Sequence, residues 1–342
     1  MKMLKFDEEY YKGVIEEYNY NPMELRPLDF NFGSVDVNTM KKKWLCHQDG
    51  DMFIKGYQDK QQSIITTGVG LSGSPHIGTL SQILRTIYLQ QAGFTVQFVL
   101  GDLDSYNARN QSMSVLEERA DKYTILIREL GFDTEKGILR SQNLRNDVLK
   151  TAYLISNCLT DQDFLEAEED LSDLYKKKGI YSGIQFPVKQ AILLMVADFV
   201  DLGMHHNFKQ VLVMLGLEEH LYVLLARKVI ERMGIPMKLS ALYSRIVKGL
   251  NGYPKMSKSI KGSGITVEMS EDEIMDLIMN REGEYCNPWD SVVYQMMCSV
   301  SYYNSSELEN LEKKCALKST EWQKAKRDYA EVLIEICKKW PK

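Results

Sequence analysis

Two short apolar runs with a helical stretch between them stand out in the pattern of hydrophobic and polar positions. The β-branched run 63–68 ends at a glycine and predicts a buried parallel strand. Over 76–92 apolar residues recur at helical spacing, and Gly93 follows as a stop signal. The run 96–100 predicts a second strand. Strand, turn, helix and strand in this order form a βαβ unit, which implies a parallel sheet.

The alternation of apolar runs and helical spacing continues further along the chain. Helical spacing over 116–130 stops at Gly131, and the more polar stretch from about 132 to 184 predicts an insertion between two halves of the sheet. The run 211–215 predicts another buried strand, followed by a predicted helix over 218–233.

These elements predict an α/β fold, a doubly wound parallel sheet of the Rossmann-like kind with a connective insertion and a C-terminal helical domain. Amphipathic spacing predicts C-terminal helices over 271–279, 289–303 and 319–339. The expected domains are an N-terminal extension with short helices, a sheet domain and a helical domain, over 1–62, 63–262 and 263–342.

Charge and composition restrict the classes of function. The 342 residues carry a net charge of -5, with 44% hydrophobic and 26% charged residues. This balance argues against binding of DNA or RNA through overall positive charge. Any RNA contact would use local lysine patches, for which a solvated surface is the alternative reading. The candidate patches are 41–43, 176–178 and 338–339.

The six cysteines are scattered and form no Cys-x-x-Cys pair. They predict free thiols in a reducing compartment, with neither a disulfide framework nor a zinc site. The chain shows no signal peptide and no apolar run of membrane-spanning length, so we expect a cytoplasmic protein without a membrane segment.

The first candidate for chemistry is the segment from Gly70 to Thr79, which contains Pro75-His76-Ile77-Gly78. It lies between the first predicted strand and its helix, where open α/β sheets bind ligands. Small residues allow a nucleotide to approach the backbone, and a helix N-terminus offers N–H groups to phosphate. A glycine-rich turn alone is weak evidence, but the Pro-His-Ile-Gly sequence is more specific.

The second candidate is Lys255-Met256-Ser257-Lys258-Ser259, in a segment bracketed by glycines. Two lysines and two serines on a loop can stabilise the charge that develops on a reacting triphosphate. Taken alone, the segment reads as an exposed basic loop. About half the chain separates it from His76, which leaves room for the rest of a doubly wound sheet.

His76-Ile77-Gly78 and the segment 255–259 resemble the two signature motifs of class I aminoacyl-tRNA synthetases. The resemblance extends over nearly the whole chain and is strongest to the tryptophanyl and tyrosyl enzymes, especially archaeal and eukaryotic tryptophanyl-tRNA synthetases. It is carried by the segments 29–36, 65–70, 186–191, 215–219 and 289–340. It implies a Rossmann-like fold of the HUP type with an anticodon-reading helical domain.

The resemblance also implies roles for individual residues. The catalytic residues would be His76, Lys255 and Lys258. The ATP-binding residues would be Gly68, Gly70, Gly78, Thr79, Met256, Ser257 and Ser259. The amino-acid-binding residues would be Thr66, Gln190, Glu218 and Glu219. ATP with Mg²⁺ would be a substrate, without a permanent cofactor or a dedicated metal site. The relatives imply a homodimer.

The chain departs from the family pattern around the substrates. Thr79 replaces the second histidine of the first motif, and Val69 replaces an arginine. Thr66 stands where the family has an aromatic residue, and Glu218-Glu219 replaces an Asp-Gln pair. Tryptophan is the first candidate substrate, but these changes suit another amino acid as well, because altered hydrogen-bonding groups change selectivity strongly.

Three functions are therefore kept open. The first is a translation enzyme that activates an amino acid with ATP and transfers it to tRNA. The second is a specialised paralogue with altered specificity, used in biosynthesis or resistance. The third is a catalytically silent RNA-binding or regulatory relative, which Thr79 and Val69 favour and the intact 255–259 segment opposes.

Other polar residues have structural interpretations. His205-His206 reads as a surface turn, because we expect no third metal ligand nearby. Asp102 and Asp104 end the second predicted strand, where contact with substrate and helix capping are equally good explanations.

Overall fold

The computed structural model describes residues 6–23, 36–144, 146–168, 184–256 and 262–342. These residues form a seven-stranded sheet in the order β1-β2-β7-β6-β3-β4-β5. The five strands from β7 to β5 are parallel. Their bounds are β3 Ser63–Gly70, β4 Val96–Gly101, β5 Gly137–Ser141, β6 Gln210–Gly216 and β7 Lys238–Ser244. The strand order reverses between β3 and β6, so the doubly wound Rossmann-like prediction is confirmed.

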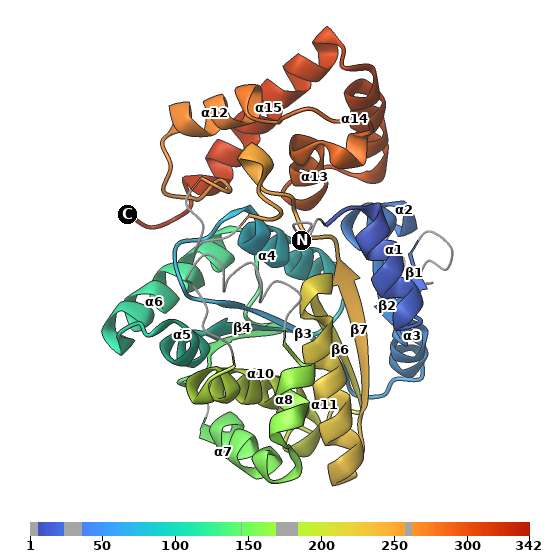
Figure 1. The fold of residues 1–342 in the computed structure, drawn as a ribbon, viewed down its shortest axis with the longest axis vertical. Coiled ribbons are helices and arrows are strands. Elements are labelled where there is room, and N and C mark those ends of the chain that lie inside the picture. The colour runs from blue at the N-terminus through green and yellow to red at the C-terminus, as the bar shows by residue number, and fades with distance from the viewer. Residues whose placement is uncertain (1–5, 24–35, 145, 169–183, 257–261) are drawn as a thin grey trace.

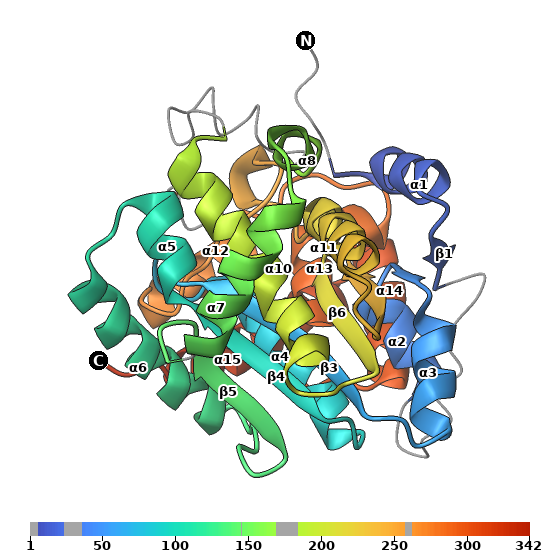
Figure 2. The ribbon, with the colours of Figure 1, turned by 90° about the horizontal axis from the view of Figure 1, so that it is seen from below.

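Helices cover both faces of this sheet (Figures 1 and 2). On one face α4 packs on β3 and β4, and on the other α10 packs on β6. Two clusters of buried apolar side chains fill the two interfaces. The helices before the C-terminal domain are α1 Glu8–Glu17, α2 Val37–Lys43, α3 Gly50–Gln58, α4 Ile77–Gln91, α5 Asp102–Arg109, α6 Met113–Glu129, α7 Asn146–Ile155, α8 Asp161–Glu166, α10 Phe186–Met204 and α11 His220–Met233.

The elements with strong periodicity are confirmed. The predicted strands 63–68, 96–100 and 211–215 are the centres of β3, β4 and β6. α4 and α6 end as expected, since Gly93 and Gly131 adopt φ of 101° and 110°, which favour glycine. The helix predicted over 218–233 begins slightly later, because a 3₁₀ turn over Leu217–Glu219 precedes α11.

The sequence predicts that the polar stretch 132–184 is an insertion between two halves of the sheet. The structure differs, because part of this stretch belongs to the sheet itself. Its start forms β5, which pairs in parallel with β4 along five residues. This strand lies at the edge of the sheet and carries Arg140, a buried charged residue. A short strand with a charged residue has no apolar pattern, and for that reason the sequence did not reveal it.

The N-terminal extension contributes strands as well as the predicted short helices. β1 Asn21–Pro22 pairs antiparallel with β2 Cys46–Gln48, and β2 pairs antiparallel with β7. Strands of two and three residues are too short for a periodic signal. The position of β2 depends on its pairing with the edge of β7, and β1 in turn pairs with β2.

The C-terminal helices gather above α4 (Figure 1). They are α12 Glu271–Asn280, α13 Val292–Ser299, α14 Ser305–Leu317 and α15 Thr320–Cys337. α13 packs directly on α4 and is shorter than the predicted helix 289–303, while α14 was not predicted. No helix of the described ranges combines the length and the apolar character that a bilayer crossing requires.

Candidate active site

A cavity of about 400 Å³ lies at the carboxyl ends of β3, β4 and β6. The strand order reverses between β3 and β6, and the crevice at such a reversal is where open α/β sheets bind ligands. Both sequence motifs reach this cavity, since His76, Lys255 and Met256 are among its lining residues.

His76 caps the N-terminus of α4. Its Nδ1 accepts a hydrogen bond from the backbone N–H of Thr79 at 3.1 Å. Because Nδ1 is the acceptor, the neutral ring carries its proton on Nε2. A Cβ at Gly78 would lie 2.9 Å from the Cε1 atom of His76. Glycine at this position therefore leaves space for the imidazole ring. The cap therefore fixes an N–H donor at a helix N-terminus, where phosphates bind.

Backbone hydrogen bonds tie the first motif to the chain that follows the second. The Ile77 N–H donates to the Ile265 carbonyl at 3.2 Å, and the Val267 N–H donates to the Pro75 carbonyl at 3.0 Å. A β-bridge joins His76 to Thr266 between them. This backbone pairing holds the first motif beside residues 265–267, which follow the second motif. Ser257, Lys258 and Ser259 lie outside the described residues.

Lys255 reaches Glu218, the first of the two acidic residues that follow β6. Its Nζ lies 3.6 Å from Oε1 of Glu218, and both side chains are largely buried. Glu219 lines the same cavity. A Cβ at Gly216 would collide with the Glu218 carboxylate, so this glycine allows the carboxylate to fold back over the strand end. The cavity therefore contains both a lysine and acidic groups.

The surroundings of Gly68 require a glycine, whereas those of Gly70 leave room for a side chain. A Cβ at Gly68 would lie 2.6 Å from the Val99 carbonyl oxygen, so close strand packing requires glycine there. At Gly70 the nearest atom would be Ser105 Oγ at 3.5 Å, an ordinary contact. Both residues line the cavity, as we expect for residues that contact a nucleotide. Strand packing alone, however, already requires a glycine at position 68.

Two of the residues expected to bind the amino acid do not line the cavity among the described residues. Thr66 is fully buried, and its Oγ1 accepts a hydrogen bond from Gln97 Nε2 at 3.0 Å. Gln190 lies half-buried on α10, outside the set of lining residues. Their roles in binding stay predictions.

A buried polar chain that the sequence did not indicate reaches the cavity through Asp104, Gln142 and Asp198. Arg140 Nη2 lies 2.6 Å from Oδ1 of Asp198, and Gln142 Nε2 donates to Oδ2 of Asp198 at 2.8 Å. Gln142 Oε1 in turn accepts from the backbone N–H of Asp104 at 3.0 Å. The one available signal was the charged residue Asp198 within the apolar pattern of α10.

Asp102 and Asp104 differ in their surroundings. Asp102 is structural, since its Oδ1 accepts from the backbone N–H groups of Leu103, Gln142 and Asn143 at 2.9, 3.0 and 3.2 Å. Asp104 lines the cavity, and its Oδ1 has no hydrogen-bond partner among the described residues. Burial, with Asp198 nearby, raises the pKa of Asp104 well above its usual range.

One face of α10 contributes an apolar wall to the cavity. It consists of Val188, Ala191, Ile192, Met195 and Phe199. The cavity thus combines the N-terminus of α4 with an apolar wall from α10.

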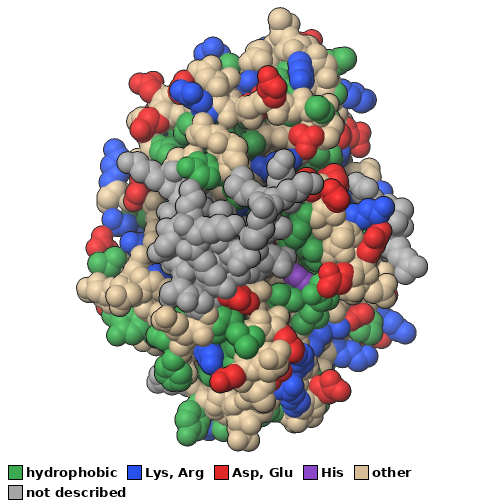
Figure 3. All heavy atoms as spheres, in the orientation of Figure 1, with side chains coloured by type: hydrophobic (Ala, Val, Ile, Leu, Met, Phe, Trp, Pro, Cys, Tyr) green, Lys and Arg blue, Asp and Glu red, His purple; other side chains and the backbone are tan. Residues whose placement is uncertain are grey.

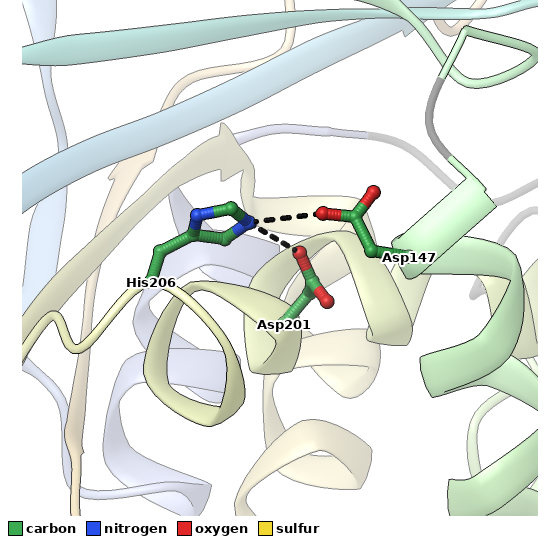
Figure 4. A group of neighbouring side chains, drawn as sticks. All are labelled: Asp147, Asp201 and His206. Atoms are coloured by element: carbon green, nitrogen blue, oxygen red, sulfur yellow. Dashed lines mark hydrogen bonds and ion pairs between the residues drawn. The ribbon is translucent and has the colours of Figure 1, made fainter.

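The expectation that His205-His206 has no further metal-ligating side chain nearby is wrong. His206 Nε2 lies 3.2 Å from Oδ2 of Asp147 and 3.1 Å from Oδ2 of Asp201 (Figure 4). His205 Nδ1 lies 2.8 Å from Oδ1 of Asp201. These side-chain contacts join α7 to the end of α10, and we assign no metal to the cluster.

Comparison with known proteins gives one consistent family. Residues 58–338 match the family described as tRNA synthetases class I (W and Y). A tryptophan–tRNA ligase of Methanopyrus kandleri is 24% identical, over 95% of this chain and 88% of the relative. A tyrosine–tRNA ligase of the same organism is 27% identical, over 64% of each chain. The structure of tryptophanyl-tRNA synthetase from Aeropyrum pernix K1 superposes with a TM-score of 0.79 at 20% identity, covering 97% of this chain and 92% of that one.

The family match covers most of the chain and includes both motif segments that meet at the cavity. The similar structure has the same fold along nearly the whole length. This chain therefore belongs to the class I tRNA synthetases, in the subclass of the tryptophan and tyrosine enzymes.

Proposed function

We propose that the protein activates an amino acid, with tryptophan as the first candidate, as an aminoacyl-adenylate and transfers it to tRNA. The observation that carries this proposal is the meeting of His76 and Lys255 at one cavity beside the N-terminus of α4. A helix N-terminus, a fixed imidazole N–H and a lysine are suited to the phosphates of ATP.

In the proposed reaction a carboxylate oxygen of the amino acid attacks the α-phosphorus of ATP. The bond between the α-phosphorus and the oxygen bridging to the β-phosphate breaks, and pyrophosphate leaves. The Nε2–H of His76 would donate to an α-phosphate oxygen, and Lys255 with Lys258 would neutralise the pyrophosphate. Catalysis of this kind rests on positioning and charge stabilisation, and magnesium enters bound to the ATP phosphates.

The choice of tryptophan rests on the apolar chamber of α10 and on the relatives. An apolar chamber with a polar end suits a large side chain that carries one hydrogen-bond donor, as the indole and phenol groups do. The relatives include both tryptophan–tRNA and tyrosine–tRNA ligases at similar identity. The tryptophan enzyme of Methanopyrus kandleri aligns over 95% of this chain, against 64% for the tyrosine enzyme of the same organism, which makes tryptophan the first substrate to test.

A specialised paralogue is the second candidate, because the chain departs from the family pattern at several positions, of which Glu218 and Glu219 line the cavity. Thr66 is small and engaged with Gln97, and the buried pair of Arg140 and Asp198 adds charge at the end of the chamber. The two functions differ in a growth test. A specialised enzyme would adenylate an amino acid without replacing the housekeeping synthetase of the cell.

We assign tRNA binding to the C-terminal helices over 263–342, with 63–262 as the catalytic domain and 1–62 as an extension. Positively and negatively charged side chains are interspersed on the face shown in Figure 3. The predicted lysine patches are partly used within the protein, since Lys42 pairs with Glu312 and Lys338 pairs with Glu271. The third predicted patch, 176–178, lies outside the described residues.

We expect the protein to exchange pyrophosphate into ATP in the presence of one amino acid. Replacing Lys258 by Ala should lower this exchange at least about 100-fold, because a charge that stabilises the transition state is lost. A screen of all standard amino acids with radiolabelled pyrophosphate measures both effects. Lys136→Ala, at an exposed lysine of the loop before β5, is the matched control. Exchange with no amino acid, or an unchanged rate in Lys258→Ala, would support the silent relative instead.

We also propose a homodimer that forms through α7. Leu144 and Tyr153 are 76% and 81% exposed, and Leu149 lies one helical turn before Tyr153. Exposed apolar side chains gathered on α7 and just before it indicate an interface. Replacing Leu144 and Tyr153 by Glu should convert a dimer to a monomer in analytical ultracentrifugation. Leu317→Glu, equally exposed at the end of α14, should leave the mass unchanged. A monomeric wild-type chain would refute this proposal.

A further inference from the structure

Three consecutive carbonyl groups in the loop between β3 and α4 accept hydrogen bonds from side chains of α6 and of the turn before it. Arg119 Nη1, on α6, donates to the Leu71 carbonyl. Gln111 Nε2, in the turn before α6, donates to the Ser72 carbonyl at 2.9 Å. The two donors are themselves joined, since Arg119 Nη1 also donates to Gln111 Oε1 at 2.7 Å.

Tyr123, also on α6, holds the third of these carbonyls. Its hydroxyl donates to the Gly73 carbonyl at 3.0 Å and also interacts with the Thr79 side chain. The residue is fully buried, and Trp340 packs edge-to-face against its ring, with 5.2 Å between the ring centroids. Burial raises the pKa of Tyr123, so the hydroxyl keeps its proton and remains a donor. Tyr123 therefore contacts the chain on both sides of His76.

The direction of these carbonyl groups matters for an anion. A backbone carbonyl oxygen carries negative partial charge and repels phosphate, whereas backbone N–H groups attract it. Ser72, His76 and Thr79 line the cavity, so this loop borders the space proposed for the phosphates. The three donor residues are not among the described lining residues, so they would act on a ligand through the loop and not by contact.

We propose that Arg119 and Tyr123 are positioning residues for the phosphate site, because they hold the loop before His76 with its carbonyl oxygens turned towards α6. The inference rests on the proposed use of ATP, whose phosphates would lie at the N-terminus of α4. Without these donors a loop carbonyl is free to turn towards the phosphates, and the imidazole loses part of the support that fixes its place.

The rival reading is that these hydrogen bonds stabilise the fold and have no effect on the ligand. Any buried hydrogen bond from a side chain to a loop carbonyl contributes to stability, so a lower melting temperature does not separate the two readings. They differ in the affinity for ATP of a variant that keeps its fold. The test therefore needs a variant that loses an equivalent hydrogen bond far from the cavity.

The first test compares Tyr123→Phe with Tyr57→Phe. Tyr57 donates to the Gly93 carbonyl at 3.0 Å, so the control loses the same kind of bond at the opposite end of α4. We expect Tyr123→Phe to raise the Kd for ATP about tenfold in calorimetry, and Tyr57→Phe to leave it unchanged. Adenosine, which has no phosphate, should bind both variants as it binds the wild type. Unchanged ATP affinity in Tyr123→Phe, or a parallel loss of adenosine binding, would overturn the proposal.

The second test uses Arg119→Met, which removes the donor to the Leu71 carbonyl and keeps an unbranched side chain. We expect its Kd for ATP to rise about tenfold, with a smaller rise in Arg119→Lys, whose ammonium group still donates. Arg128→Met, at an exposed arginine of the same helix, is the control. Unchanged ATP affinity in folded Arg119→Met, or an equal loss in Arg128→Met, would overturn the proposal.

Both tests measure binding, so they separate this inference from the proposed function. If ATP binds and the variants weaken it, but no amino acid supports pyrophosphate exchange, the positioning role is supported and the proposed function fails. If exchange occurs but the variants bind ATP like the wild type, the positioning role fails alone. A wild-type chain that binds no ATP would refute both.

Discussion

Replacing His76 by Asn is expected to lower the rate of pyrophosphate exchange about 100- to 1000-fold with little change in stability. Asn is a good helix N-cap, so the variant keeps a side-chain acceptor for the Thr79 N–H. It loses the Nε2–H that the cap directs towards the phosphates. The variant therefore separates the capping role of His76 from its proposed chemical role.

The loss should fall mainly on kcat, because the donor acts most strongly on the charge that develops at the α-phosphate. Steady-state exchange at saturating ATP measures kcat, and a thermal melt checks the fold. His205→Asn, at a histidine outside the cavity, is the matched control. Equal rates for His76→Asn and the wild type would contradict the proposed contact with phosphate. A lower melting temperature in His76→Asn would instead show that the cap needs the imidazole.

Replacing Asp198 by Ala is expected to destabilise the protein by about 3–5 kcal/mol, because it leaves the Arg140 guanidinium buried without its carboxylate. The side chains of Arg140 and Asp198 are 6% and 5% exposed. Gln142 also loses the acceptor for its Nε2. The pair joins β5 to α10, so its loss weakens both the sheet edge and one wall of the cavity.

Equilibrium unfolding in urea measures this change. The control is the double variant Arg140→Leu with Asp198→Leu, in which both charges are removed. It should recover much of the lost stability, because apolar residues often replace a buried ion pair at little cost. If Asp198→Ala unfolds at the same urea concentration as the wild type, the pair contributes nothing to stability. If the double variant is as unstable as the single one, packing and not charge explains the loss.

The sequence by itself determined the elements that depend on local pattern. β3, α4 and β4 follow from a β-branched run, helical spacing and the glycine stop at Gly93. A helix and a strand of sufficient length bury one face, and that requirement appears directly in the order of residues. The placement of His76 at the start of α4 follows in the same way. The chemistry of the 255–259 segment came from its residue types and from family resemblance.

The tertiary structure alone decided the features that depend on residues far apart in the chain. β5 and β2 are too short and too polar for a periodic signal, and each exists because a neighbouring strand offers an edge. The ion pair of Arg140 with Asp198 joins elements that no local pattern connects. Arg85 reads in the sequence as an ordinary charged residue of an amphipathic helix. Its burial against α13 is the consequence of how the C-terminal helices pack on α4, and this packing turned a surface-type residue into part of the cavity. Local periodicity records which face of an element is apolar, but it does not record which other element covers that face.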